Sequence, residues 1–244
     1  MQKKYLYPVF FILLASCKKN SNYCPSTVTG DISVNKPVIY EGADIKMSGN
    51  TTSAAYTYKW SGPGGWTSDQ SIASKTNMQA ANNGIYTVEV INSNNCVAYR
   101  GTKDIQVVAI PDAPCSIANN TIDGTVPGFT NVVFSYASWY SGSGFYYVTV
   151  VSANNNRIDI SFPYINTPPS PGIYKARESY TLPAPADQVN IVITAGSVQY
   201  RSKGDGDVFI KPVGGRLQIS FCSITMFNFS NPSLQYVING KISQ

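Results

Sequence analysis

The feature that most restricts the fold of this chain is a repeated alternation of apolar and polar residues. In 43–47, 56–60 and 86–90 every second residue is apolar, and the pattern recurs in 157–162 and 217–221. Side chains of an extended strand alternate between two faces, so this period places each apolar set on one face of a sheet. Beyond the signal-like start of the chain, no apolar pattern at helical spacing is sustained. We therefore expect an all-β protein.

Turn-forming residues divide the chain into two predicted domains. The sequence has 19 glycines, 15 prolines and 17 tyrosines, and only 13% of its residues are charged, which favours turn-rich β structure. Pro111-Asp112-Ala113-Pro114 predicts a stiff linker, because proline interrupts strand pairing. We predict an N-terminal domain at 24–110 and a second domain at 115–244, each an antiparallel β-sandwich.

The second predicted domain contains most of the expected strands. These are 130–139, 145–152, 157–162, 189–194, 197–201, 207–211, 216–226 and 234–242. Residues 145–151 are apolar on both faces, which predicts a central strand or one beneath a covering loop. The apolar parity shifts after Phe221, which predicts a β-bulge near Cys222. The proline-rich stretch 166–187 is interpreted as a long crossover between sheets.

The first residues have the pattern of an export signal. Lys3 and Lys4 precede an apolar run that has about half of the roughly 20 residues a membrane-spanning helix needs. The following Leu14-Ala15-Ser16-Cys17 resembles the lipobox of bacterial lipoproteins. This resemblance implies a signal peptide at 1–16, a lipid on Cys17 and a polar tether at 17–23. It also implies a cell-envelope protein anchored to the membrane by its lipid. We expect the anchor to lie in the outer membrane, and the sequence does not decide between its surface and periplasmic faces.

The first predicted domain resembles the immunoglobulin-like repeats of bacterial surface proteins. Trp60 ends one expected strand, and Asn83-Gly84-Ile85-Tyr86-Thr87-Val88 is similar to the tyrosine corner that begins immunoglobulin strand F. Val88 stands where that family has its second cysteine, and Met47 is the expected counterpart on strand B. The resemblance therefore implies an Ig-like sandwich in which an apolar contact replaces the inter-sheet disulfide.

Apart from Cys17, the chain has four cysteines, Cys24, Cys96, Cys115 and Cys222. An even number in an exported protein predicts disulfides, and three connectivities are possible. We favour Cys24–Cys96 and Cys115–Cys222, because each pair then lies within one domain. A zinc site is disfavoured, since no two of these cysteines are close in sequence and the chain has no histidine.

The composition argues against several classes of function. The formal net charge is +5, but four lysines of that excess lie near the start of the chain, so the remainder is nearly neutral. We therefore expect no nucleic-acid partner. The absence of histidine excludes Ser-His-Asp and Cys-His nucleophiles and histidine-ligated metals. The 13 acidic residues leave a carboxylate-pair glycosidase as an alternative, but the sequence brings no two of them together. We expect no enzyme, no cofactor and no metal, and interpret Gly204-Asp205-Gly206-Asp207 as a β-turn rather than a calcium loop.

An aromatic cluster flanks a predicted hairpin turn. Five rings lie on either side of a Gly/Ser sequence: Trp139, Tyr140, Phe145, Tyr146 and Tyr147. Neighbouring residues of a strand point to opposite faces, and rings exposed beside a turn can stack on sugar rings. Packing of the same rings into the core is the alternative interpretation. We select Trp139, Tyr140 and Tyr146 as candidate ligand-binding residues, and Trp66, which follows a glycine-rich loop, invites the same two interpretations.

Together these observations predict a membrane-anchored envelope lipoprotein that binds without catalysis. Its expected partner is a glycan or an envelope protein, bound as an adhesion or recognition module. The alternative is a structural or accessory subunit of a larger assembly in the cell envelope. An open sheet edge or an apolar surface patch is expected in that case.

Overall fold

The computed structural model describes residues 27–49, 55–163, 167–178, 187–204 and 206–244. Regular structure in these ranges consists of β-strands and two single-turn 3-10 helices, and the expected all-β class is confirmed. Neither described helix is long and apolar enough to cross a membrane. The predicted signal peptide and tether, including Cys17, lie outside the described residues, as does Cys24.

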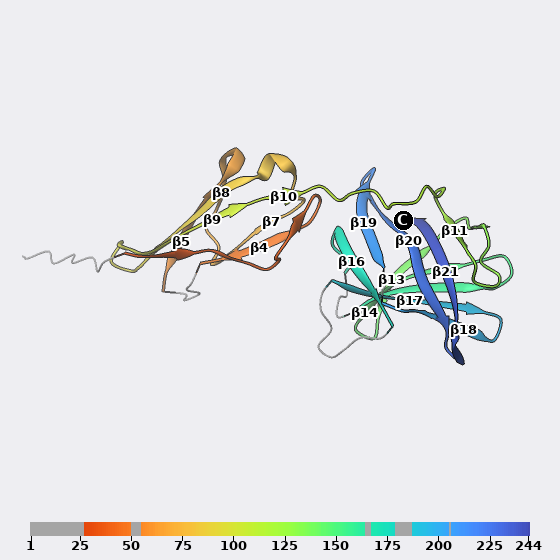
Figure 1. Cartoon of the computed structure of the whole chain (residues 1–244). Coiled ribbons are helices and arrows are strands. Elements are labelled where there is room, and N and C mark those ends of the chain that lie inside the picture. Colours follow the sequence, from red (N-terminus) through yellow and green to blue (C-terminus); the bar gives the residue numbers. More distant parts are fainter. Residues whose placement is uncertain (1–26, 50–54, 164–166, 179–186, 205) are drawn as a thin grey trace, which may run out of the picture.

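Ten strands form the N-terminal unit, which lies on the left of Figure 1. They are β1 (Val28–Asp31), β2 (Ser33–Val34), β3 (Ile39–Tyr40), β4 (Ile45–Ser48), β5 (Thr57–Gly62), β6 (Trp66–Ser68), β7 (Ile72–Lys75), β8 (Gly84–Ile91), β9 (Val97–Ile105) and β10 (Val107–Val108). One sheet has the order β1-β9-β8-β5-β6, a second has the order β2-β4-β7, and β10 pairs with β3. A single cluster of buried side chains lies between them.

Buried aromatic residues tie this unit together as the immunoglobulin-like resemblance implies. The hydroxyl of Tyr86, on β8, donates a 3.1 Å hydrogen bond to the carbonyl oxygen of Asn82, which is the bond of a tyrosine corner. Trp60 is 2% exposed and belongs to the same buried cluster. Met47 and Val88, which the resemblance predicts to form an apolar contact in place of a disulfide, are both fully buried in that cluster.

Eleven strands form the C-terminal unit, which lies on the right of Figure 1. They are β11 (Thr121–Gly124), β12 (Val132–Val133), β13 (Ser138–Gly142), β14 (Phe145–Val151), β15 (Arg157–Pro163), β16 (Gly172–Arg177), β17 (Gln188–Ala195), β18 (Val198–Ser202), β19 (Asp207–Val213), β20 (Arg216–Asn228) and β21 (Asn231–Ser243). Their order is β12-β11-β21-β20-β19-β16-β17-β15-β14-β13, and β18 pairs with both β17 and β20. A second buried cluster lies inside this network.

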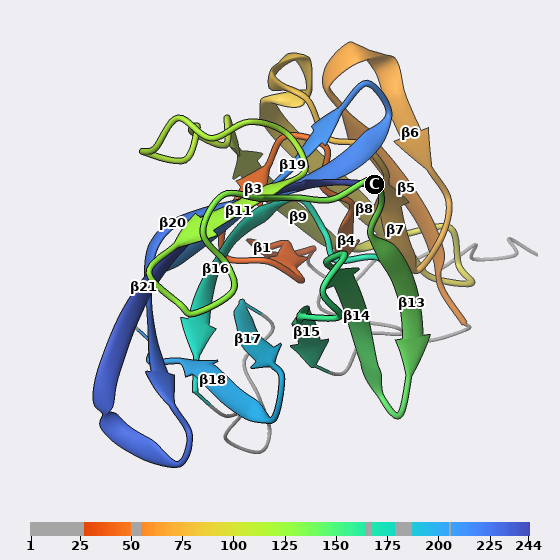
Figure 2. The ribbon, with the colours of Figure 1, turned by 90° about the vertical axis from the view of Figure 1, so that its right-hand side faces the viewer.

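The long strand β20 makes this sheet curl. Its first part pairs with β19 and its last part with β18, so β16, β17, β18, β20 and β19 close a ring of hydrogen-bonded strands. Figure 2 shows β20 and β21 as a long curved hairpin. The bend falls at a register shift between Phe221 and Ile224, where Ser223 has a φ of 54°. The expected bulge near Cys222 is therefore confirmed.

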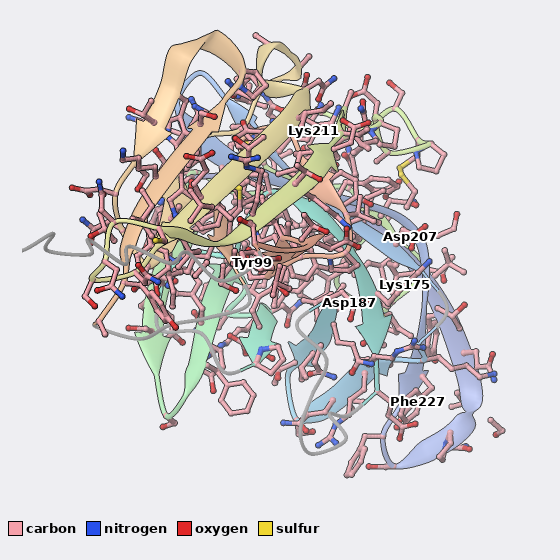
Figure 3. The ribbon with its side chains drawn as sticks, turned by 90° about the vertical axis from the view of Figure 1, so that its left-hand side faces the viewer. Tyr99, Lys175, Asp187, Asp207, Lys211 and Phe227 are labelled. Carbon is pink, nitrogen blue, oxygen red and sulfur yellow. A yellow bond between two sulfur atoms is a disulfide. The ribbon has the colours of Figure 1, made fainter. Side chains whose placement is uncertain are left out.

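The segment that joins the two units is attached to the C-terminal unit by an ion pair. Nζ of Lys211, which Figure 3 labels on β19, donates a 2.7 Å hydrogen bond to Oδ1 of Asp112 in the predicted linker. This hydrogen bond, together with the charge of Lys211, lowers the pKa of Asp112. The described core residues on either side of the segment form two separate clusters.

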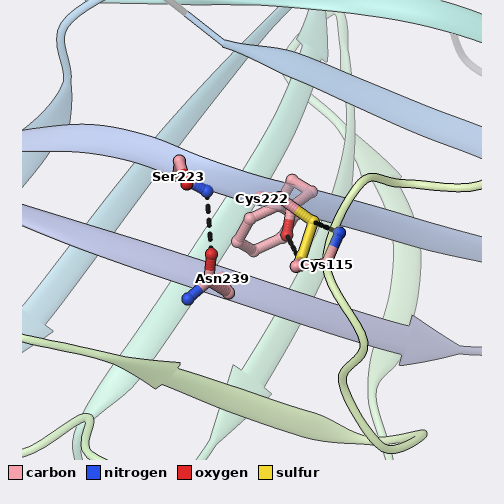
Figure 4. Close-up of a disulfide and its surroundings, with 5 residues drawn as sticks. Cys115, Cys222, Ser223 and Asn239 are labelled. Atoms are coloured by element: carbon pink, nitrogen blue, oxygen red, sulfur yellow. Dashed lines mark hydrogen bonds between the residues drawn. A yellow bond between two sulfur atoms is a disulfide. The ribbon is translucent and has the colours of Figure 1, made fainter.

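A disulfide holds the residues after this linker against the bulge of β20. Cys115 and Cys222 are bonded with their Cα atoms 5.8 Å apart, as we favoured from the sequence. Figure 4 shows this bond next to Ser223, whose backbone N–H donates to Oδ1 of Asn239 at 2.8 Å. The bulge is thus fixed from two sides. Cys96 is also disulfide-bonded, but its predicted partner, Cys24, lies outside the described residues.

Two predictions about the C-terminal unit are wrong, one of them in part. The stretch 166–187, expected as a crossover, contains β16, whose alternate residues are buried between β17 and β19. The proline-rich context hid the short period-two pattern of this strand. The prediction for 145–151 is wrong in part: β14 is paired on both sides, but it lies next to the last strand of the sheet and its outer face is not covered, since Val151 is 50% exposed. Its outward rings instead contact one another, as described below.

Candidate functional site

The hairpin of β13 and β14 presents its rings on two different faces. Its turn residues, Ser143 and Gly144, both have positive φ, as a two-residue hairpin turn of type I′ requires. This turn places Tyr140 opposite Tyr147, and Trp139 opposite Val148. Directly paired residues share a face, so Tyr140 and Tyr147 lie on one side of the sheet and Trp139 lies on the other.

The outer face, defined here as the face away from the buried cluster, carries a row of three rings. The rings of Tyr140 and Tyr147 are stacked, with centroids 5.4 Å apart and an interplanar angle of 21°. Phe145 lies 6.0 Å from Tyr147 at a tilt of 42°. Tyr140 is 42% exposed, and the other two rings are half-buried. We call Tyr140, Tyr147 and Phe145 the aromatic row.

The inner face of the same hairpin belongs to the core. Tyr146 is only 6% exposed within the buried cluster, so our selection of Tyr146 for an exposed platform is wrong. Trp139 is half-buried and packs against the same cluster, and its Nε1 is buried without a hydrogen-bond partner in the described structure. The strand period thus separates Trp139 and Tyr146 from Tyr140. Core packing therefore holds for the rings of the inner face, and the rings of the outer face are left partly exposed.

A polar network adjoins the aromatic row on the outer face. The Thr149 hydroxyl donates a 2.6 Å hydrogen bond to Oδ1 of Asp159, on β15. Nε and Nη2 of Arg157 lie 2.7 Å from the same oxygen. The hydroxyls of Tyr140 and Thr149 are 3.3 Å apart and also bonded, which connects the network to the aromatic row. The three donors all reach Oδ1, so Oδ2 of Asp159 is left without a partner among the described residues.

Charge is balanced within this network. The side chain of Asp159 is 20% exposed and that of Arg157 is 46% exposed. The hydrogen bond from Arg157 to Asp159 raises the pKa of the guanidinium, and the carboxylate charge adds to this effect. Arginine is charged at any physiological pH, so the pair presents one positive and one negative group with no net charge.

Trp66, on the N-terminal unit, lies away from this surface in the sequence and in its contacts. Its ring is half-buried, meets Tyr86 edge-on at 5.5 Å and packs against the buried cluster of that unit. Nζ of Lys75 lies 5.9 Å from the ring centroid. Core packing therefore accounts for most of the contacts of Trp66.

A groove of about 660 Å³ lies where the two units meet. Nζ of Lys36, in the N-terminal unit, donates a 2.5 Å hydrogen bond to Oγ of Ser170 in the C-terminal unit. Burial lowers the pKa of Lys36, and the charge of Asp44 partly opposes this. The hydrogen bond between Lys36 and Ser170 thus joins the two units across the groove.

The described residues contain no cluster of side chains that could form a metal site. Groups of three or more Asp, Glu, Cys or His side chains that could hold a metal ion are absent there. Asp207 of the Gly/Asp sequence instead forms an ion pair with Lys175, and Figure 3 labels both residues. Asp205 lies outside the described residues.

Comparison with known proteins gives no family for this chain. No protein-family model matches it, and no curated protein matches it. Among solved structures, it is similar to the three N-terminal domains of the highly immunogenic outer capsid protein (Hoc) of bacteriophage RB49. The sequences are 10% identical, the TM-score is 0.30, and the match covers 89% of this chain and 98% of that one. The function of this chain is therefore inferred from its own residues.

Several residues of the site were not selected from the sequence. Phe145 and Tyr147 belong to the aromatic cluster of the sequence but not to its candidate binding residues, although a two-residue turn at Ser143-Gly144 places Tyr147 beside Tyr140. Arg157 and Asp159 were read only as the polar face of an alternating strand. Their proximity to the aromatic row follows from the pairing of β14 with β15, which a single-strand pattern does not contain.

Proposed function

We propose that this protein binds a glycan on the outer face of β13, β14 and β15, without catalysing a reaction on it. The observation that carries this proposal is the aromatic row beside the network of Asp159, Arg157 and Thr149. Aromatic faces attract the C–H faces of sugar rings, and charged side chains accept or donate hydrogen bonds to their hydroxyls. Oδ2 of Asp159 is an acceptor of this kind that remains available.

The proposal includes a lipid anchor at the cell envelope. Its support is the lipobox-like sequence that ends at Cys17, together with the cysteine content expected of an exported protein. We propose that Cys17 is lipidated and that the outer membrane holds the protein. Substitution of Cys17 by Ser then moves the protein from the membrane fraction to the soluble fraction, and retention in the membrane fraction would contradict the anchor.

A glycan array probed with the full-length protein tests the binding role. We expect binding that Tyr140→Ala and Tyr147→Ala each reduce at least roughly fivefold, because stacking on an aromatic ring contributes about 1 kcal/mol or more. The matched control is Tyr136→Ala, since Tyr136 is 73% exposed just before β13 and lies outside the aromatic row. Equal losses of binding in all three variants, or no binding to any glycan of the array, would contradict a glycan site.

A structural or accessory role in an envelope assembly is the second candidate. The observation that favours it is the position of β13, which ends the strand order of its sheet. Val133 and Tyr136, just before this edge, are 69% and 73% exposed. An open edge of this kind can pair with a strand of another protein. Crosslinking in native membranes through a photoreactive residue at position 136 tests this role, and the absence of any crosslinked protein would argue against it.

A further inference from the structure

Arg201, on β18, carries a guanidinium group that forms no ion pair with any acidic side chain of the described residues. Its Cζ lies 3.9 Å from the centroid of the Phe229 ring, so the guanidinium is stacked on an aromatic surface. Phe229 is itself 49% exposed. Nε of Arg201 is buried without a hydrogen-bond partner, and no ion pair to Arg201 occurs among the described residues. Because Nε is buried, a planar acceptor would meet the two Nη groups at the end of this half-buried side chain.

The neighbours of Arg201 add positive charge and hydrogen-bonding groups. Arg201 pairs across the sheet with Phe227, which Figure 3 labels, and Phe227 pairs with Gln235 on β21. Lys203 reaches the same row, where its Nζ donates a 3.3 Å hydrogen bond to Oε1 of Gln235. Lys203 also makes no ion pair within the described part of the chain. This patch therefore has two positive charges, while the network at Asp159 is neutral.

The patch lies on the same face as the proposed glycan site. Strand pairing places Asp159 opposite Val192, and Val192 opposite Arg201, and paired residues share a face. Neighbouring strands are about 4.8 Å apart, so two steps separate Asp159 from Arg201 by roughly 10 Å along the sheet. This is the scale of two or three sugar residues.

We propose that Arg201 binds the carboxylate of an acidic sugar within the glycan that the aromatic row holds. Carboxylate is the planar anion that matches the fork of a guanidinium, through two parallel N–H···O bonds. Lys203 supplies a second positive charge at the same patch. The proposal deepens the proposed function and rests on it for the sugar, but the carboxylate site stands on the contacts of Arg201.

Titration of the full-length protein with a short oligogalacturonate and with its methyl ester tests this inference. Arg201→Gln removes the charge, and Arg201→Lys keeps the charge and removes the fork. Arg216→Gln is the matched control, because Arg216 begins β20, whereas Arg201 pairs with Phe227 near the other end of that strand. Arg216 is exposed, and its Nη1 makes a 3.4 Å hydrogen bond to the carbonyl oxygen of Gln244. Thermal unfolding of each variant shows whether it folds.

We expect the oligogalacturonate to bind more tightly than its ester, and Arg201→Gln to weaken it roughly tenfold to a hundredfold, as loss of a charged hydrogen-bonded pair implies. Arg201→Lys recovers part of this loss, and Arg216→Gln has no effect. Equal affinities for acid and ester, or no effect of Arg201→Gln, would overturn the inference. Binding of an acidic peptide with the same dependence on Arg201 would overturn the choice of a sugar.

The same titrations separate this inference from the proposed function. If Tyr140→Ala weakens both the acid and the ester while Arg201→Gln changes neither, the glycan site stands and the carboxylate site fails. If Arg201→Gln weakens the acid and neither Tyr140→Ala nor Tyr147→Ala changes anything, the carboxylate site stands and the aromatic row is not the glycan site.

Discussion

Two arginines on one face of the C-terminal sheet differ in the group that contacts their guanidinium. Arg157 donates a hydrogen bond from Nε to Asp159 and forms an ion pair with it through Nη2, so its charge is cancelled by that residue. Arg201 is stacked on Phe229 and has no acidic partner in the described ranges. Both lie beside aromatic rings, so aromatic content does not distinguish the two surfaces. The two surfaces differ in whether the guanidinium is paired with an acidic side chain.

This difference bears on the kind of ligand that each surface can bind. A paired guanidinium offers few free donors and no net charge, which suits the hydroxyls of a neutral sugar. An unpaired guanidinium gains most from a ligand that brings its own negative charge. One sheet face can thus recognise two features of a single polymer, the shape of its rings at one place and its charge at another.

The largest effect on oligogalacturonate binding is expected when Arg157 loses its acidic partner and so comes to resemble Arg201. Asp159→Asn keeps an oxygen that can accept from the Thr149 hydroxyl, but it removes the charge that neutralises Arg157. In the Arg201→Gln background, we expect this change to restore oligogalacturonate binding roughly tenfold, because it creates a new unneutralised guanidinium on the same face. Isothermal titration of the double variant measures it.

Asp123→Asn is the control for an effect of net charge, because it removes one negative charge without changing the partner of Arg157. Oδ1 of Asp123 accepts from the backbone N–H of Asn131 on a different part of the unit, so this variant raises the net charge equally. Restoration by Asp123→Asn to the same extent would show that binding follows net charge and not the pairing of Arg157.

The outline of the fold could be predicted from the sequence, because the alternation of apolar and polar residues is a pattern within a single strand. It predicted the strands around Trp60, Val88 and Ile160, and the parity shift near Cys222 predicted the bulge. The tyrosine corner was also accessible, since its bond joins residues four positions apart. Strand β16 was not predicted because it lies within a proline-rich segment, and only its pairing with β17 and β19 in the assembled sheet buries it.

The candidate site was accessible only in part, because its contacts cross between strands. The stacking of Tyr140 on Tyr147 follows from the turn, and turn residues are local. By contrast, the alignment of Asp159 with Arg201 depends on the pairing of β15 with β17 and of β17 with β18. That Arg201 meets Phe229 rather than a carboxylate depends further on how β20 bends. No pattern within a single strand encodes these relationships.

A smaller effect is expected on stability, where the two arginines again differ. Arg157→Gln removes a hydrogen bond and an ion pair from a carboxylate that is only 20% exposed, so we expect the free energy of unfolding to fall by about 1 kcal/mol. Arg201→Gln removes no hydrogen bond and eliminates a buried donor without a partner, so we expect a loss of about 0.5 kcal/mol or less. Urea unfolding of both variants measures the difference, and equal losses would show that pairing does not distinguish the two side chains.

The smallest effect concerns the ring beneath the second arginine. Phe229→Leu keeps an apolar side chain and removes the aromatic face on which the Arg201 guanidinium lies. The guanidinium then loses its fixed orientation and must be ordered when a carboxylate binds, which costs about 0.5–1 kcal/mol and weakens oligogalacturonate roughly two- to fivefold. Tyr147→Leu is the counterpart on the first surface and should weaken the acid and the methyl ester alike. An exchange of these two responses would mean that the rings, and not the pairing of the arginines, determine which ligand each surface prefers.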